Sequence, residues 1–209
     1  KILLYGLEVN QSLRKNWAWS VQYENRWDAD WTRHQRGILD ASIENTLFSA
    51  VKVNLQYRYS EERNRTGGYT PKQRLAFRLS SEGDFGKGEW NARFMTAQGV
   101  GSKSHSTDMP WQEEGQSWRL RVGYQHERQG FWRWKMDLEQ FPDFQKLPEH
   151  KTRFRWLITR DINESLSACM GYIWSQEWNA IDPQTLHIVK ANLSWTLDRP
   201  KKRKKSKIM

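Results

Sequence analysis

The chain has 209 residues, a formal net charge of +10, 37% hydrophobic residues and a mean hydropathy of −0.94. The sequence contains no run of about 18 apolar residues, which excludes helical membrane spans. They do not exclude a transmembrane β-barrel, since the strands of such a barrel are half polar.

Two features of the composition narrow the class of protein further. The 13 Trp residues are many for a chain of this size, and Trp concentrates where apolar and aqueous surroundings meet, as at a membrane interface. The segment Arg199–Met209 carries seven Lys or Arg and no acidic residue, so most of the net charge lies there. We therefore predict a barrel domain over residues 1–198 and a basic C-terminal tail over residues 199–209.

Apolar and polar residues alternate along almost the whole chain, which predicts β-strands with one apolar and one polar face. The clearest case is VKVNLQYRYS, residues 51–60, and no segment shows a helical period. In chain order, the predicted strands cover residues 3–13, 17–27, 38–47, 51–60, 73–80, 89–97, 117–127, 131–140, 151–159, 165–176 and 185–197. The predicted fold class is therefore all-β.

The predicted connections alternate in length. Short turns follow the first, third, seventh and ninth strands, a middling Gly-rich segment at 81–88 follows the fifth, and longer links follow the even strands. This rhythm predicts an up-and-down antiparallel barrel. Bacterial barrels have an even number of strands and end in the periplasm. We therefore expect about 12 strands, with one strand before Lys1 and 11 in this sequence, or a C-terminal portion of a larger barrel.

The aromatic residues of the apolar faces lie near strand ends, and aliphatic residues lie in strand middles. This banding predicts two aromatic girdles and apolar faces in contact with lipid. The predicted girdle residues are Trp17, Trp27, Tyr57, Tyr59, Trp90, Trp118, Trp132, Trp174 and Trp195. The expected location is the bacterial outer membrane, with membrane lipid as a partner and the C-terminus in the periplasm. A soluble β-barrel or sandwich with the apolar faces in its core is the alternative.

The polar faces are rich in Arg. The predicted lumen-lining residues are Arg26, Arg58, Arg74, Arg78, Arg93, Arg119, Arg121, Arg133, Arg153, Arg155, Glu24, Asp40, Glu44, Asp137 and Glu139. Because a guanidinium pairs bidentately with a carboxylate, they can form a cross-strand ion-pair network that fills a narrow lumen. The functional interpretation of the same residues is a pore that favours anions.

The segments LQYRYSEERNR, PKQRLAFRLS, SWRLRVGYQHE, WKMDLEQF, HKTRFRWLITRDI and HIVKANLSWTL follow one another along the chain. They resemble a family of outer-membrane barrels known only as a domain of unknown function. The shared features are paired Arg residues, a Glu–aromatic pair before a loop and a closing strand that begins with HI. The resemblance covers most of the chain and implies a barrel fold and an outer-membrane location, with no known activity. The basic tail departs from such barrels, which usually stop at or just after their final strand.

Other chemistry is sparse in the sequence. The five His residues have no metal-ligand spacing, and no nucleotide or hydrolase motif occurs. We therefore expect no metal, no cofactor and no catalytic residue. His126 and His187 are predicted to face outward, but at opposite rims and without a Ser partner, so a lipid-modifying barrel enzyme is kept only as an alternative.

The predicted function is an integral outer-membrane β-barrel that is not an enzyme. It would act as a narrow or plugged pore, or as a structural or partner subunit of an envelope complex joined through its loops or tail. The longest link, Gly99–Gln116, would be exposed or would fold into the lumen as a plug. The tail DRPKKRKKSKIM would lie in the periplasm, so we expect no nucleic acid as a partner but consider an anionic periplasmic partner. A soluble β-barrel that binds an acidic partner is the remaining alternative.

Overall fold

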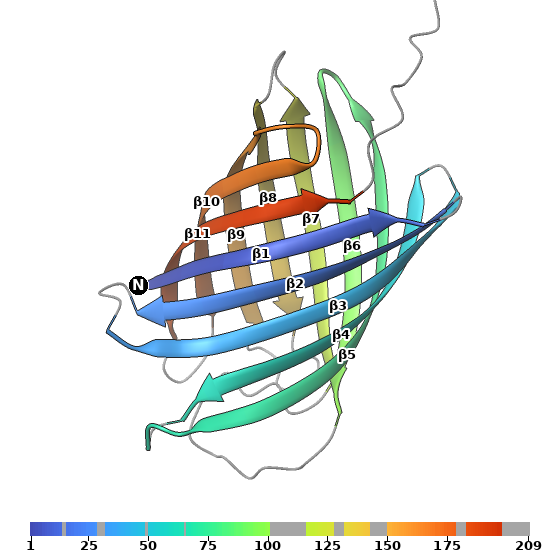
Figure 1. Ribbon diagram of the computed structural model, residues 1–209. Coiled ribbons are helices and arrows are strands. Elements are labelled where there is room, and N and C mark those ends of the chain that lie inside the picture. The colour runs from blue at the N-terminus through green and yellow to red at the C-terminus, as the bar shows by residue number, and fades with distance from the viewer. Residues whose placement is uncertain are drawn as a thin grey trace, which may run out of the picture.

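The computed structural model describes residues 1–13, 16–28, 32–48, 50–64, 66–100, 116–127, 132–142, 150–178 and 183–197. These residues form eleven β-strands (Figure 1). The strands are β1 (Ile2–Ser12), β2 (Trp17–Asp28), β3 (His34–Phe48), β4 (Val51–Arg63), β5 (Tyr69–Phe85), β6 (Gly88–Gly99), β7 (Gln116–Glu127), β8 (Trp132–Pro142), β9 (His150–Asp161), β10 (Leu166–Trp178) and β11 (Thr185–Thr196). The described part of the chain contains no helix with the length and apolarity that a membrane span requires.

The strands form one closed barrel in which each strand pairs antiparallel with its neighbour in the chain. The predicted all-β fold class and up-and-down order are therefore confirmed. Connections of two to four residues join β1–β2, β3–β4, β5–β6, β7–β8 and β9–β10 at one end, which we call the short-turn end. Connections of five residues or more join the remaining pairs at the other end, which we call the long-connection end.

The barrel closes through a parallel pair between β1 and β11, which lie side by side in Figure 1. The seam runs from Ile2↔Ile188 to Asn10↔Thr196. In an up-and-down barrel with an odd number of strands the first and last strands run the same way, so their pairing has to be parallel. Closure is thus reached with the eleven strands present and without the twelfth strand that we expected before Lys1.

Several strands extend beyond their predicted limits. β3 begins at His34 instead of residue 38, and β5 runs from Tyr69 to Phe85 instead of covering 73–80. The alternation weakens at these ends because both faces are polar there, but the backbone ladder continues. The predicted turn at 81–88 is reduced to Gly86 and Lys87, and the positive φ of Gly86 (62°) suits this tight hairpin. Most of the predicted link Gly99–Gln116 lies outside the described residues, and so does the whole tail at 199–209.

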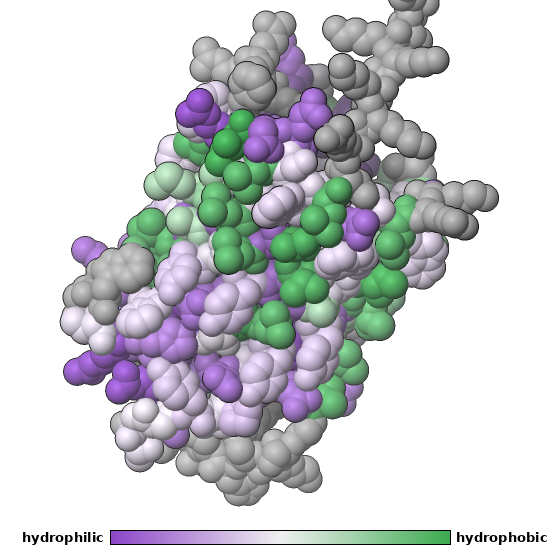
Figure 2. All heavy atoms as spheres, viewed as in Figure 1, coloured by the Kyte–Doolittle hydropathy of each residue, from purple (hydrophilic) through white to green (hydrophobic). Residues whose placement is uncertain are grey.

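Most apolar side chains lie outside and most charged ones inside, although a few apolar side chains such as Ile38 and the cluster of Leu4, Ile173 and Ile188 are also buried. Asp137 is only 2% exposed, whereas Val122 on the neighbouring strand is 62% exposed. Figure 2 shows aliphatic side chains, in green, across the middle of the visible wall, and strongly polar ones, in purple, toward its lower left edge. This is the reverse of a soluble globular domain, in which charged residues are almost never fully buried without partners. The apolar face of the alternation is therefore the outer face of the barrel.

Gly123 on β7 shows how tightly the inner face is packed. It lies opposite Asp137 on β8, and a Cβ at Gly123 would clash with Asp137 Oδ1 and come within 3.0 Å of the Asn91 amide. The absent side chain therefore leaves room for the Asp137 carboxylate to lie over the strand, where its charged partners reach it.

We predict that Gly123→Ala lowers the free energy of unfolding by about 1–3 kcal/mol, because the new methyl group displaces the Asp137 carboxylate. Urea unfolding of the barrel in detergent micelles, followed by Trp fluorescence, measures the change. Gly99→Ala is the matched control, since nothing lies within 4 Å of a Cβ at Gly99. Equal stability of the two variants would contradict this account of the packing.

Candidate functional site

The inner face holds the polar residues that the sequence predicted for the lumen. Alternation along each strand and pairing with buried neighbours place all of them inward. Five are buried: Glu24, Asp40, Arg121, Asp137 and Glu139. The lumen lining is therefore a set of packed charges contributed by most of the strands.

The best-formed ion pair joins β3 and β4. Asp40 and Arg58 lie directly opposite each other, and Arg58 donates from Nε to Oδ1 at 2.7 Å and from Nη2 to Oδ2 at 2.6 Å. This bidentate arrangement is the strongest geometry that a guanidinium and a carboxylate can adopt. The pair links β3 and β4 across the inner face.

A second centre of charge lies on β8. Asp137 and Glu139 are two residues apart and therefore point to the same face. Arg155 Nε lies 3.7 Å from Asp137 Oδ2, and its Nη2 lies 3.6 Å from Glu139 Oε2. Arg153 approaches Glu139 at 3.3 Å, and Arg121 approaches Asp137 at 4.0 Å. The two carboxylates thus hold guanidinium groups from the strands on both sides.

Phe141 is an aromatic residue among these charges that sequence reasoning missed. It was assigned to a link, but β8 continues through it, and its ring lies 4.8 Å from Arg119 Cζ and 4.7 Å from Arg153 Cζ. A guanidinium over an aromatic face is attracted by the ring quadrupole. The alternation through Asp137 and Glu139 would have placed Phe141 on the inner face, had the strand been extended by two residues.

Three pairs of Arg residues lie directly opposite each other on neighbouring strands, at Arg26↔Arg36, Arg58↔Arg74 and Arg93↔Arg121. Like charges in this position are destabilising. Sequence reasoning missed Arg36, because it lay in a predicted link. Arg36 donates to Ser60 Oγ at 3.2 Å and lies 3.7 Å from Glu62.

The remaining lumen residues complete the network. Arg78 donates to Gln56 at 2.6 Å, and Glu44 lies opposite the buried Asn54 on β4. Arg133 forms an ion pair with Asp161 near the short-turn end. Glu24 accepts from Lys190, a lumen residue that was not among those predicted, at 3.1 Å. Acidic residues thus lie among the basic ones throughout the described lumen.

The predicted girdle residues lie on the outer face. Trp17, Trp132 and Trp195 are about half exposed, and Arg160 lies over the ring of Trp132 at 5.2 Å. Tyr57 donates to Gln73, and Tyr59 donates to Glu61. Their position at a membrane interface remains a prediction.

The outer face also carries a chain of hydrogen bonds near the long-connection end. His34 Nε2 lies 3.0 Å from Asn25 Oδ1, and His34 Nδ1 lies 3.0 Å from the Tyr69 hydroxyl. A register shift between Arg26 and Trp27 brings β3 into this position. Sequence reasoning missed this relay because His34 and Tyr69 lay in predicted links.

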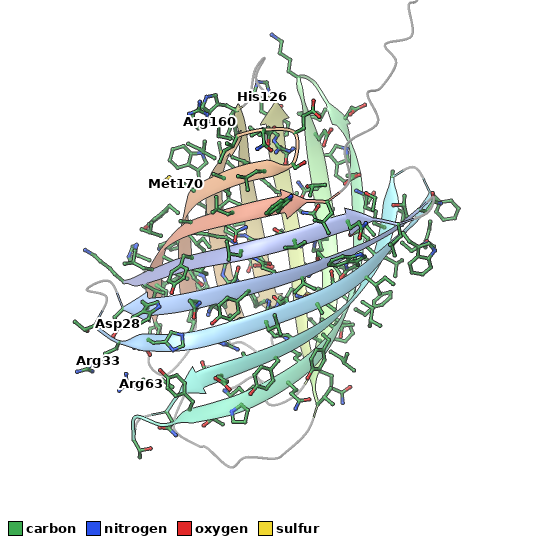
Figure 3. The ribbon with its side chains drawn as sticks, in the orientation of Figure 1. Asp28, Arg33, Arg63, His126, Arg160 and Met170 are labelled. Carbon is green, nitrogen blue, oxygen red and sulfur yellow. The ribbon has the colours of Figure 1, made fainter. Side chains whose placement is uncertain are left out.

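Two further His residues that face outward, His126 and His187, have different partners. His187 is hydrogen-bonded to Tyr172, and His126 lies beside the ring of Trp134. Figure 3 shows His126 and Arg160 at one end of the barrel and Asp28, Arg33 and Arg63 at the other. His126 therefore lies at the short-turn end, far from His34.

The comparisons with known proteins give a family but no activity. A family model described as "Protein of unknown function (DUF2490)" matches residues 3–186. The chain belongs to this family. No curated protein and no solved structure matches the chain. Membership in DUF2490 confirms the resemblance to a family known only as a domain of unknown function, so the function has to be argued from the barrel itself.

We predict that Asp40→Asn lowers the free energy of unfolding by about 3 kcal/mol, because Arg58 then keeps its charge without a carboxylate. Asp161→Asn is the comparison: Arg133 and Asp161 are each more than a third exposed, and we expect a loss below about 1 kcal/mol. Urea unfolding in detergent micelles measures both changes. Similar losses for the two variants would contradict a larger contribution of the Asp40–Arg58 pair to the free energy of unfolding.

Proposed function

We propose that the chain is an integral β-barrel of the bacterial outer membrane, with a narrow, Arg-rich lumen that favours anions and with no enzymatic activity. The observation that carries the proposal is the inverted distribution of side chains. Charged groups such as Asp137 and Glu139 are buried inside, while Leu, Val, Tyr and Trp side chains cover the outside. The girdle residues would lie at the two interfaces, and the C-terminus would lie in the periplasm.

The outer face supports the membrane location on energetic grounds. Exposed apolar side chains occur on every strand, among them Leu7, Leu39, Leu55, Leu120 and Leu193. A soluble monomer rarely exposes a continuous apolar surface of this extent, because contact between apolar surface and water is unfavourable. In lipid the same surface is stable, and a closed barrel leaves no unpaired strand edge in the hydrocarbon.

The inner face supports a narrow lumen and argues against a wide water-filled channel. Charges on strands that are not neighbours reach each other: Lys190 Nζ on β11 lies 3.1 Å from Glu24 Oε1 on β2, and β1 lies between the two strands. A barrel of about 12 strands lies between the filled and the open sizes. An Arg-rich lining favours anions over cations. A structural or partner subunit of an envelope complex would use the same barrel with the lumen closed.

We predict that Val122→Arg, on the outer face of β7, costs about 2–4 kcal/mol of stability in lipid vesicles, because it places a charge against hydrocarbon. Ile162→Arg is the control, since Ile162 is also about half exposed but lies in the β9–β10 turn. Reversible urea unfolding from vesicles measures both.

Two results would contradict the proposed membrane location. One is a wild-type chain that stays folded and monodisperse in buffer without detergent. The other is a Val122→Arg variant as stable as Ile162→Arg in vesicles.

The relay of Asn25, His34 and Tyr69 favours a second candidate function, cleavage of a lipid ester at the outer face. A nucleophile, a base within hydrogen-bond reach and a group that orients the base are the parts of nucleophilic catalysis. The Tyr69 oxygen would attack the ester carbonyl while His34 accepts its proton. His34 would return that proton to the leaving alcohol, and water would then cleave the acyl–tyrosine ester.

This candidate predicts that the purified barrel releases fatty acid from phospholipid in mixed micelles, and that His34→Ala abolishes the release. His126→Ala, at the opposite end of the barrel, should leave the rate unchanged. Titration of released fatty acid measures the activity. Absence of release by the folded wild-type barrel removes the enzyme candidate and leaves the non-enzymatic proposal.

A further inference from the structure

A glycine interrupts the outer face of β3 near the long-connection end. Gly37 lies in a row of outward-facing residues that crosses neighbouring strands, with Asn25 on β2 directly opposite it on one side and Glu61 on β4 directly opposite it on the other. A Cβ at Gly37 would be in ordinary contact with His34 Cε1, at 3.8 Å, and with the Tyr23 hydroxyl, at 4.0 Å. The outer wall therefore has room for a side chain at this position, and the glycine leaves that room unused.

Two other glycines that face outward are covered by aromatic rings. A Cβ at Gly83 on β5 would come within 2.8 Å of Trp90 Nε1, so the indole lies over this glycine. A Cβ at Gly88 on β6 would come within 2.7 Å of Tyr124 Cζ, so the phenol ring lies over that one. At Gly37 the corresponding contacts are about 1 Å longer, and no ring of a described residue occupies the space.

Hydrogen-bonding groups border this space, although the outer face is mostly apolar. Asn25 is only 8% exposed, and its Oδ1 accepts from the Tyr23 hydroxyl at 3.2 Å and lies 3.0 Å from His34 Nε2. Glu61 is exposed and accepts from the Tyr59 hydroxyl at 2.8 Å, and a carboxylate with one such partner has further acceptor positions. We call the following residues the Gly37 site: Tyr23, Asn25, His34, Gly37 and Glu61.

Aromatic contacts hold the imidazole of the Gly37 site in place. Tyr69 reaches from β5 to His34 on β3, where its hydroxyl lies 3.0 Å from Nδ1 and the two ring centroids are 5.6 Å apart. The indole of Trp27 packs edge-on against the same imidazole, with the ring centroids 5.3 Å apart. Because these contacts fix the ring before any ligand arrives, a bound molecule would lose little affinity in ordering the site.

The Gly37 site lies where the apolar outer face meets the polar long-connection end. Toward the middle of the wall follow Leu39, Ile43 and Leu55, each more than 40% exposed. Figure 2 shows polar side chains gathered at the lower left of the visible wall, where Figure 1 places the adjacent ends of β2 and β3. An amphiphile with its headgroup at Gly37 would therefore lay its acyl chains along the apolar wall.

We propose that the Gly37 site binds the sugar ring of a glycolipid headgroup. A pyranose has an apolar C–H face, which packs on aromatic rings, and a rim of hydroxyl groups, which form hydrogen bonds with carboxylate and amide groups. The Glu61 carboxylate disfavours a phosphate at the same place, because like charges repel. This inference rests on the proposed membrane location and names the class of lipid that this part of the wall holds.

The test uses the full chain refolded in lauryldimethylamine oxide, a detergent without sugar, and counts bound lipid by native mass spectrometry. The probe is a glucosyl dialkylglycerol, whose ether-linked chains cannot be cleaved as esters, so the enzyme candidate does not affect the result. We expect one bound probe per wild-type barrel. Sugar-free dialkylglycerol and dialkyl phosphatidylglycerol with the same chains should bind about tenfold more weakly, because they lack the hydrogen bonds of the sugar.

Gly37→Val fills the site with a residue that suits a strand, so we expect it to fold and to bind the probe about tenfold more weakly than the wild type. Gly99→Val is the matched control. Gly99 lies at the same end of the barrel but opposite Arg74 on the inner face, and nothing lies within 4 Å of a Cβ there. This control should bind the probe as the wild type does.

A second pair of variants tests the polar groups without filling the space. Glu61→Ala removes an exposed acceptor of the Gly37 site and should also weaken binding of the probe. Tyr172→Phe removes a hydroxyl that is hydrogen-bonded to His187 on the outer face, away from Gly37, and should leave binding unchanged. If Gly37→Val fails to fold, the comparison of Glu61→Ala with Tyr172→Phe decides the matter.

Three outcomes would overturn the proposed site. They are equal binding of the glucosyl lipid and its sugar-free counterpart, unchanged binding in Gly37→Val, and equal affinities of Glu61→Ala and Tyr172→Phe. A barrel that needs detergent but shows no preference for the glucosyl lipid would disprove the site alone. A chain that stays folded and monodisperse without detergent would disprove the membrane location.

Discussion

The parallel ladder between β1 and β11 is the contact on which the rest of this barrel depends. Without it, the ten antiparallel pairs would form a curved sheet with two open edges, and unpaired backbone groups at those edges are costly in lipid and adhesive in water. With it, every strand has two neighbours, and an interior becomes distinct from an exterior. Gly6 belongs to this region: a Cβ there would come within 2.7 Å of the Tyr23 carbonyl oxygen and 2.8 Å of the Asn192 amide oxygen, so its small size permits close approach at the seam.

Closure of the barrel also determines how strongly the charged side chains of the lumen interact. On an open sheet, Arg26, Arg93 and Arg153 would each face water and interact weakly with distant groups. Inside a narrow barrel, residues far apart in sequence face each other in surroundings of low dielectric constant, where charge interactions are stronger. Asp40 with Arg58, and Asp137 and Glu139 with Arg153 and Arg155, offset much of this repulsion.

The sequence predicted the parts of the fold that depend on local pattern. Alternation located all eleven strands and assigned residues such as Val122 and Asp137 to the correct faces, because adjacent side chains of a strand point in opposite directions. It failed where the pattern fades. The strand ends there are held by hydrogen bonds to a neighbouring strand, and the local sequence pattern does not predict such pairing. These ends contain His34, Arg36, Tyr69 and Phe141. The Asn25–His34–Tyr69 relay and the Phe141 stack were missed for this reason.

The sequence by itself determined the strand order, the two faces and the inventory of charges, since all three follow from residue spacing and composition. Only the tertiary structure decided that eleven strands close through a parallel seam, since closure depends on strand twist and register around the whole barrel and not on any one segment. It also decided which Arg residues share a neighbourhood. Arg26 and Arg93 look alike in the sequence, each a basic residue on the polar face of a strand. In the folded barrel Arg26 lies opposite Arg36 and Arg93 lies opposite Arg121, because the register between neighbouring strands sets these pairs.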